Sequence, residues 1–243
     1  MNFGLSCLKE FVDGVLSGKD KELVRRGIVE KAEGHVFDLS LTNRLTEEVK
    51  AALTSLGYKV IDVVAKVDYK AITGTSEGLF HLVFEVGLNY DEVLDIPYIP
   101  GSVIKGVLRN NFYSLTNSYG DELFGGKENE GYIIVSDAYP VGGAMKLLTG
   151  DIINPHYYKG GKPVQSEYDV NPVPIIHLAV REGVKFRFLI GVDKGAKLPK
   201  VNLNVKDAVE LVSLLLLYSM KTGLGARSTK GYGFFEVEKF EVV

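Results

Sequence analysis

The order in which the hydrophobic period changes along the chain constrains the fold most. From residue 58 onward the pattern predicts strand, helix, strand, strand, helix and strand. The approximate bounds are 60–72, 101–116, 131–139, 184–192, 205–221 and 233–242. That order is typical of the β-α-β-β-α-β, ferredoxin-like unit. We therefore expect one α+β domain over residues 58–243, with inserted hairpins at about 74–100 and 140–180.

The first 57 residues are expected to form a helical N-terminal extension packed on this core. Apolar residues recur there at helical spacing, and Gly57 follows the last of them where a left-handed C-cap is common. Asn43 or Thr46 is the expected N-cap of the helix that ends at Gly57. In the first insertion, residues 79–86 alternate with period two, which predicts a strand.

Composition excludes several classes of protein. The 243 residues carry a formal net charge of −3, which argues against a generally basic nucleic-acid coat but leaves room for a local basic patch. Cys7 is the only cysteine, which excludes disulfide frameworks and cysteine-based zinc sites and fits a reducing, cytoplasmic setting. No apolar run is long enough to span a bilayer, so no membrane partner is expected.

Candidate catalytic and metal groups are sparse. The four histidines are scattered, with no pair at metal-ligand spacing. Asp137 and Asp151 could together hold a metal ion, but we predict neither a metal nor a cofactor.

A glycine-rich segment between the last helix and the last strand is the first candidate site. Four glycines lie within residues 223–233, with Arg227, Ser228, Thr229 and Lys230 between them, Lys221 just before them, and no acid. Glycine lets backbone N–H groups approach a phosphate closely, and Tyr232 is expected to offer a stacking face. The alternative is a mobile connection with solvated charges. The candidate RNA-binding residues are Lys221, Gly223, Gly225, Ala226, Arg227, Ser228, Thr229, Lys230, Gly231 and Tyr232.

The helix that starts near residue 101 is the second candidate. Ser102 is the expected N-cap, and Ser102, Lys105 and Arg109 recur at i, i+3 and i+7, so they share one face. An anion at the helix N-terminus would explain a cation in the first turn, whereas a solvated basic face is the alternative. In a ferredoxin-like fold this helix and the glycine-rich segment can meet, which favours one shared anionic ligand.

A long loop at about 154–174 is the third candidate. It carries His156, Tyr157 and Tyr158, which could stack on unpaired bases, at about 1–3 kcal/mol per base. A loop packed on its own aromatic side chains explains the same residues equally well.

Three segments resemble a known family. Residues 99–109 (IPGSVIKGVLR) are similar to the helix-opening signature of CRISPR-associated RAMP proteins, and residues 223–233 (GLGARSTKGYG) to their C-terminal glycine-rich loop. Residues 149–157 (TGDIINPHY), with 171–174 (NPVP), resemble one branch, the sixth subunit of the Cmr, or type III-B, effector complex. The resemblance runs from about residue 60 to the C-terminus.

The resemblance implies an RRM-like RAMP core and a non-catalytic, RNA-binding scaffold in antiviral defence. It implies that the chain binds the 3′ region of a CRISPR guide RNA, with target RNA as a further candidate ligand, beside the fourth, fifth and first RAMP subunits. Carried onto matching positions, Ser102, Lys105 and Arg109 would hold guide phosphates, and residues 225–230 would wrap the backbone. Residues 156–158 would lie on an insertion that faces the guide–target duplex or a neighbouring subunit.

Two other functions stay open. A metal-independent RAMP endoribonuclease that processes guide precursors would need a histidine base, such as His35 or His156, near the glycine-rich segment. A small-molecule enzyme would need a deep pocket with convergent groups of shifted pKa, for which the sequence gives no sign.

Overall fold

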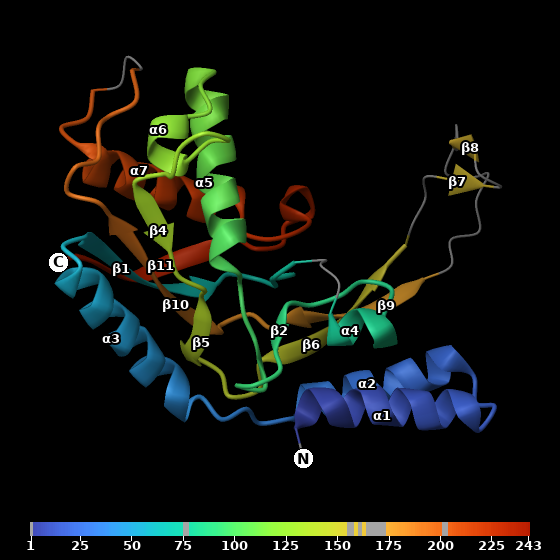
Figure 1. The fold of residues 1–243 in the computed structure, drawn as a ribbon. Coiled ribbons are helices and arrows are strands. Elements are labelled where there is room, and N and C mark those ends of the chain that lie inside the picture. The colour runs from blue at the N-terminus through green and yellow to red at the C-terminus, as the bar shows by residue number, and fades with distance from the viewer. Residues whose placement is uncertain (1, 75–77, 155–157, 160–161, 164–173, 201–203) are drawn as a thin grey trace.

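The fold was analysed in a computed structural model that describes residues 2–74, 78–154, 158–159, 162–163, 174–200 and 204–243 (Figure 1). Helices and antiparallel strands are mixed along the chain, which confirms the α+β class. The helices are α1 (Phe3–Leu16), α2 (Lys21–Gly34), α3 (Ser40–Ser55), α4 (Leu79–Val83), α5 (Gly101–Thr116), α6 (Asp121–Phe124) and α7 (Ala208–Thr222). Within the described ranges, no helix is both long and apolar enough to cross a membrane.

A five-stranded antiparallel sheet forms the centre. Its strand order is β11-β1-β10-β4, and β5 pairs with the same edge of β10 as β4. The sheet strands are β1 (Lys59–Val67), β4 (Ile133–Val135), β5 (Tyr139–Gly142), β10 (Lys185–Val192) and β11 (Phe235–Val242). The single strand expected at 131–139 is thus split in two. Between the halves, Ser136 Oγ accepts the backbone N–H of Leu189, so a side chain replaces one rung of the ladder.

The insertions form smaller ladders. β6 (Leu148–Ile153) pairs with β9 (Ile175–Val180), and two-residue pairs join β2 (Tyr90–Asp91) to β3 (Ile96–Pro97) and β7 (Tyr158–Lys159) to β8 (Lys162–Pro163). The strand expected at 79–86 is wrong, because α4 lies there. Phe80, Val83 and Phe84 are buried at spacing i, i+3 and i+4, and burial of that helical stripe outweighs the period-two alternation.

The two faces of the central sheet are both covered by helices. Alternate residues of β1, such as Ile61 and Val63, belong to the main core together with apolar residues of α5 and α7. The opposite face packs on α3, where Leu53 meets Val60 and Leu189 in a separate cluster. Figure 1 shows α5 and α7 on one side of the sheet and α3 on the other.

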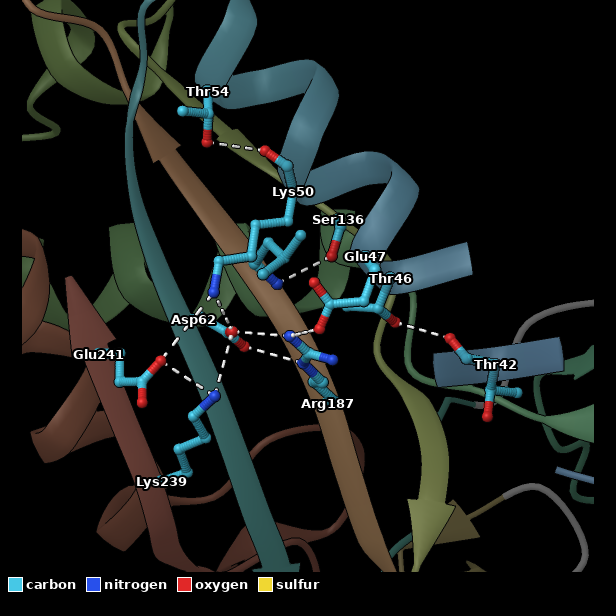
Figure 2. A network of polar contacts seen from close by, with 11 residues as sticks. Thr42, Thr46, Glu47, Lys50, Thr54, Asp62, Ser136, Arg187, Lys239 and Glu241 are labelled. Atoms are coloured by element: carbon cyan, nitrogen blue, oxygen red, sulfur yellow. Dashed lines mark hydrogen bonds and ion pairs between the residues drawn. The ribbon is translucent and has the colours of Figure 1, made fainter. Parts of the chain in front are cut away.

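A buried carboxylate ties α3 to the sheet (Figure 2). Asp62 of β1 is 0% exposed and accepts both Nε and Nη2 of Arg187, at 2.9 and 2.7 Å. Lys50 Nζ of α3 donates to the same carboxylate at 2.8 Å, and Glu47 of α3 contacts Arg187 at 2.7 Å. Burial alone would raise the pKa of Asp62, but hydrogen bonds from Arg187 and Lys50 lower it to about 2.

The N-terminal helices begin and end for local reasons. Asp95, from a distant loop, accepts the N–H groups of Phe3 and Gly4 and so caps α1. Gly57 follows α3 with φ +88°, as the C-cap expectation requires. Asn43 and Thr46 lie inside α3, whose N-cap position is Leu39, so the expected N-cap is wrong.

The network predicts the effect of Asp62→Asn. The change leaves Arg187 and Lys50 charged in a buried site, so we expect the free energy of unfolding to fall by about 3–5 kcal/mol. The pKa of Asp62 is lowered from 3.8 to about 2. In the wild type the ionised carboxylate should therefore contribute about 2 kcal/mol to the free energy of unfolding above pH 4, and this contribution should be lost as the pH falls toward 2. Urea unfolding of both proteins at several pH values measures the two effects.

Glu236→Gln is the matched control, because Glu236 pairs with Lys66 on the surface of the same sheet. An exposed pair contributes little, so this variant should unfold like the wild type. If Asp62→Asn and Glu236→Gln unfold alike, or if Asp62→Asn keeps the acid-dependent loss, the network does not hold α3.

Candidate nucleic-acid interface

The segment between α7 and β11, residues 223–234, is an ordered loop, which we call the glycine loop. Its backbone is tied to residues 70–72, which follow β1. Ala226 donates to the carbonyl of Ile72 at 2.9 Å, and Gly233 donates to the carbonyl of Lys70 at 2.7 Å. Backbone hydrogen bonds thus join the glycine loop to a neighbouring segment near both of its ends.

The conformation of the glycine loop requires glycine at two points. Gly225 has φ +98°, and a Cβ there would lie 2.3 Å from the carbonyl oxygen of Ile72. Gly233 has φ +73°, and a Cβ there would lie 2.1 Å from the carbonyl oxygen of Leu224. Positive φ and close backbone contact together exclude other residue types, so these glycines shape the loop.

The outer turn of the glycine loop presents donors to solvent. It contains one turn of 3-10 helix, Ser228–Lys230, preceded by Arg227 with φ +60°. Within the described chain, the N–H groups of Ser228 and Thr229 make no hydrogen bond. Successive free N–H groups in such a turn are typical of concavities that bind anions.

Two cations, Arg227 and Lys230, belong to this turn, and a third, Lys221, lies in the last turn of α7 before the loop. Lys221, Arg227 and Lys230 are exposed, and none of them forms an ion pair with a described residue. Exposed cations without acidic partners leave the local potential positive, although the whole chain is slightly acidic.

The helix residues predicted to join the loop are arranged differently. Pro100 is the N-cap position of α5, and Ser102 is exposed in the first turn, so the expected N-cap is wrong. Asp137 takes that role from outside the helix, because its carboxylate accepts the N–H of Gly101 at 2.7 Å. A side chain distant in sequence thus supplies what Ser102 was expected to supply.

Lys105 and Arg109 point away from the glycine loop, toward β4 and α6. Lys105 Nζ donates to the carbonyl of Ile133 at 2.9 Å, and burial with the nearby Arg109 lowers the pKa of Lys105. Arg109 pairs with Asp121 and lies over the ring of Tyr119, 5.7 Å from its centroid. Contact of these two cations with phosphates stays a prediction, but both already have partners in this structure.

The helix and the loop do meet, through the neighbouring face of α5. A groove of about 450 Å³ lies between them, and a Cβ on Gly106 would meet nothing within 4 Å. Asn111 fastens the two sides, because its amide donates to Ser219 and Thr222 of α7. The groove is lined by Val103, Gly106, Val107, Asn110, Asn111, Thr222, Gly223, Gly225 and Ser228.

Tyr232 serves the inside of the loop rather than its surface. It is 8% exposed, and its hydroxyl donates to Asp151 Oδ2 of β6 at 2.7 Å. Lys70 Nζ donates to the same oxygen at 2.9 Å. Burial raises the pKa of Asp151, but the hydrogen bonds from Tyr232 and Lys70 outweigh this and lower it. The stacking face expected of Tyr232 is therefore not accessible.

The sequence pattern does not mark Lys70 as part of this site, and it offers Asp151 as a metal ligand rather than as a partner of the glycine loop. The two aspartates of the predicted metal pair have other partners. Asp137 accepts the N–H of Gly101, and Asp151 accepts hydrogen bonds from Lys70 and Tyr232. Among the residues described, no cluster of three His, Cys, Asp or Glu side chains could hold a metal ion.

The histidines differ in their burial and in their neighbours. His177 of β9 is fully buried near Tyr232, and burial lowers its pKa. His35 stacks on Phe3, at 4.2 Å between ring centroids, among the N-terminal helices. His156 and Tyr157 lie outside the described residues, and Tyr158 begins β7.

Comparison with known proteins gives a consistent set of matches. Residues 83–236 match the model of the RAMP superfamily. A Saccharolobus solfataricus protein described as CRISPR system CMR subunit Cmr6 is 35% identical over 225 residues, 92% of this chain and 74% of the relative. The Pyrococcus furiosus CRISPR system Cmr subunit Cmr6 is 26% identical over 62% of this chain and 61% of its own.

A solved structure resembles the chain over nearly all of its length. It is a chain in the cryo-EM structure of the type III-B Cmr-beta bound to cognate target RNA. The two chains share 32% sequence identity with a TM-score of 0.74, and the match covers 91% of this chain and 74% of the other.

Gly225→Ala tests how the glycine loop is shaped. The new Cβ combines positive φ with overlap on the Ile72 carbonyl, so we expect the free energy of unfolding to fall by at least about 2 kcal/mol. Gly231→Ala is the control, since Gly231 has φ +89° but open space around it, and its free energy of unfolding should fall by only about 1 kcal/mol. Equal effects in urea unfolding would mean that the contact with Ile72 does not shape the loop.

Proposed function

The chain belongs to the RAMP superfamily and, within it, to the Cmr6 subunits of type III-B CRISPR complexes, and from this premise we propose that it is a non-catalytic, RNA-binding scaffold. Its ligand is the 3′ region of the guide RNA. Its protein partners are sibling RAMP subunits, namely the fourth, fifth and first of the complex. The match to a chain in a complex that is bound to target RNA supports RNA and Cmr subunits as partners.

One observation carries the proposal, namely the ordered glycine loop with unpaired donors. Arg227 and Lys230 flank the free N–H groups of Ser228 and Thr229 on a turn whose backbone is fixed. A phosphodiester group is bound well by this combination of positive charge and preorganised donors. Contacts with phosphates do not depend on the base sequence. The loop therefore suits a guide whose sequence varies while its backbone does not.

We also infer a ferredoxin-like, RRM-like core. In chain order the four strands of the unit are β1, β4, β10 and β11. In the sheet they lie in the order β11-β1-β10-β4, which is fourth, first, third, second. α5 follows the first of these strands and α7 precedes the last, as in the β-α-β-β-α-β unit. In this arrangement the glycine loop connects the second helix of the unit to its last strand.

The endoribonuclease is the alternative function. It needs an accessible histidine near the glycine loop. Of the three described histidines only His81 is exposed, and it lies in α4, where its backbone N–H donates to Gly78. His35 is stacked on Phe3 beside Phe37, and His177 is buried beneath the loop. These placements favour the scaffold.

The salt dependence of RNA binding tests the glycine loop. If four or five phosphates are bound, log K for single-stranded RNA should fall with log salt at a slope of about −3 to −3.5. The double variant Arg227→Ala/Lys230→Ala should bind more weakly, and its slope should be flatter by about 0.7 for each phosphate that it no longer neutralises. Fluorescence anisotropy with a labelled oligonucleotide at several salt concentrations measures both quantities.

Arg109→Ala is the matched control. It removes one cation, but that cation is already paired with Asp121, so we expect little change in the slope. An unchanged slope in the loop variant, with a flatter slope in Arg109→Ala, would move the phosphate site to α5.

Incubation with repeat RNA in EDTA separates the scaffold from the nuclease. We expect the RNA to stay intact, because a scaffold binds without cleaving. Clean cleavage by the wild type that is abolished in His156→Ala or His35→Ala would establish the endoribonuclease instead.

A further inference from the structure

One aromatic side chain beside the glycine loop has a large exposed surface. Tyr69 lies between β1 and residues 70–72 and is 52% exposed. Its ring centroid is 6.5 Å from that of Tyr232, with 59° between the ring planes. Tyr69, which is next to Tyr232 in space and open to solvent, thus offers the stacking face that the sequence predicts for Tyr232.

The position of Tyr69 is fixed by its neighbours. The adjacent Lys70 accepts the N–H of Gly233 through its carbonyl, and its ammonium group binds Asp151. The same ammonium lies 5.3 Å from the centroid of the Tyr69 ring, at a distance where a cation attracts the π face. Asp151 also accepts the Tyr232 hydroxyl, so one carboxylate holds the side chains of Lys70 and Tyr232, the two residues that contact the Tyr69 ring.

We propose that Tyr69 is a nucleobase-stacking platform for single-stranded RNA at the edge of the glycine loop. The inference rests on the proposed function, to which it adds a base contact. Tyr69 contacts Tyr232 of the loop that carries the unpaired Arg227 and Lys230. Single-strand-binding proteins combine exposed rings, which stack on bases, with cations that hold the phosphates. Because every base has a π face, such a platform tolerates any guide sequence.

Two other well-exposed tyrosines of the described chain have different surroundings. Tyr119 stacks on Tyr113, at 4.5 Å between centroids, and lies beside the Arg109–Asp121 pair. Tyr218 is 46% exposed on α7, and among the described residues its ring makes neither an aromatic nor a cation–π contact. Tyr218 therefore matches Tyr69 in exposure but not in setting, and it serves as the control.

Tyr69→Ala, Tyr69→Phe and Tyr218→Ala are compared with the wild type for binding of a short oligouridylate. Removal of a stack worth about 1–3 kcal/mol corresponds to a fall in affinity of about 5-fold to 150-fold for Tyr69→Ala. Tyr69→Phe keeps the ring and should bind like the wild type, as should Tyr218→Ala. The salt slope should stay the same in Tyr69→Ala, since no phosphate contact is removed.

Tyr69→Trp provides a direct readout, because the chain has no other tryptophan. We expect its fluorescence to be quenched when the oligouridylate binds, and we expect less quenching by the same oligonucleotide made without bases. A variant that binds with undiminished affinity but unchanged fluorescence contradicts stacking at residue 69.

The two proposals fail in different ways. If the wild type binds RNA with the expected slope and Tyr69→Ala binds equally well, the platform is wrong and the scaffold function stands. If Tyr69→Ala binds RNA normally but no longer assembles with its neighbouring subunits, the exposed ring is a protein contact instead. If the wild type does not bind RNA at all, both proposals are wrong.

Discussion

The carboxylate of Asp62 sits in the middle of the sheet, where an unpaired charge would be very costly, and so it dictates what surrounds it. Arg187 satisfies it from the neighbouring strand, and Lys50 reaches it from α3. Removing either partner would leave a buried charge unpaired. The position of α3 is therefore restricted to one that brings Lys50 to the carboxylate of Asp62. Figure 2 shows this convergence of α3, β1, β10 and β11 on one group.

Closing that face of the sheet has a consequence for function. α5 and α7 pack on one face and α3 on part of the other, and the described strand residues that α3 leaves open form ion pairs such as Lys66–Glu236 and Lys185–Glu238 rather than an aromatic surface for stacking. Contacts with an extended ligand must then come from the ends of the elements. The glycine loop and Tyr69 lie at such an end, where β1 leaves the sheet and β11 enters it.

The sequence predicts the order of the main elements because each has a long, regular hydrophobic period. It predicts the glycine loop because unusual backbone conformations need an unusual composition, and Gly225 and Gly233 meet that need. It fails where tertiary contacts decide. Residues 79–86 carry both a helical and an alternating pattern, and only burial of Phe80 selects the helix. Likewise, spacing shows that Lys105 and Arg109 share a face of α5 but not what that face meets.

The same reasoning explains why Tyr232 is buried and Tyr69 is exposed. Composition marks both as aromatic residues, and Tyr232 lies inside the glycine-rich motif, so pattern alone favours it. Asp151 reverses the choice, because a partly buried carboxylate in the β6–β9 insertion draws in the Tyr232 hydroxyl and the Lys70 ammonium together. Turning Tyr232 inward fastens the loop to the insertion and leaves Tyr69 outside. A change in the insertion that moves Asp151 should therefore act on the glycine loop, although the two are about 80 residues apart in sequence.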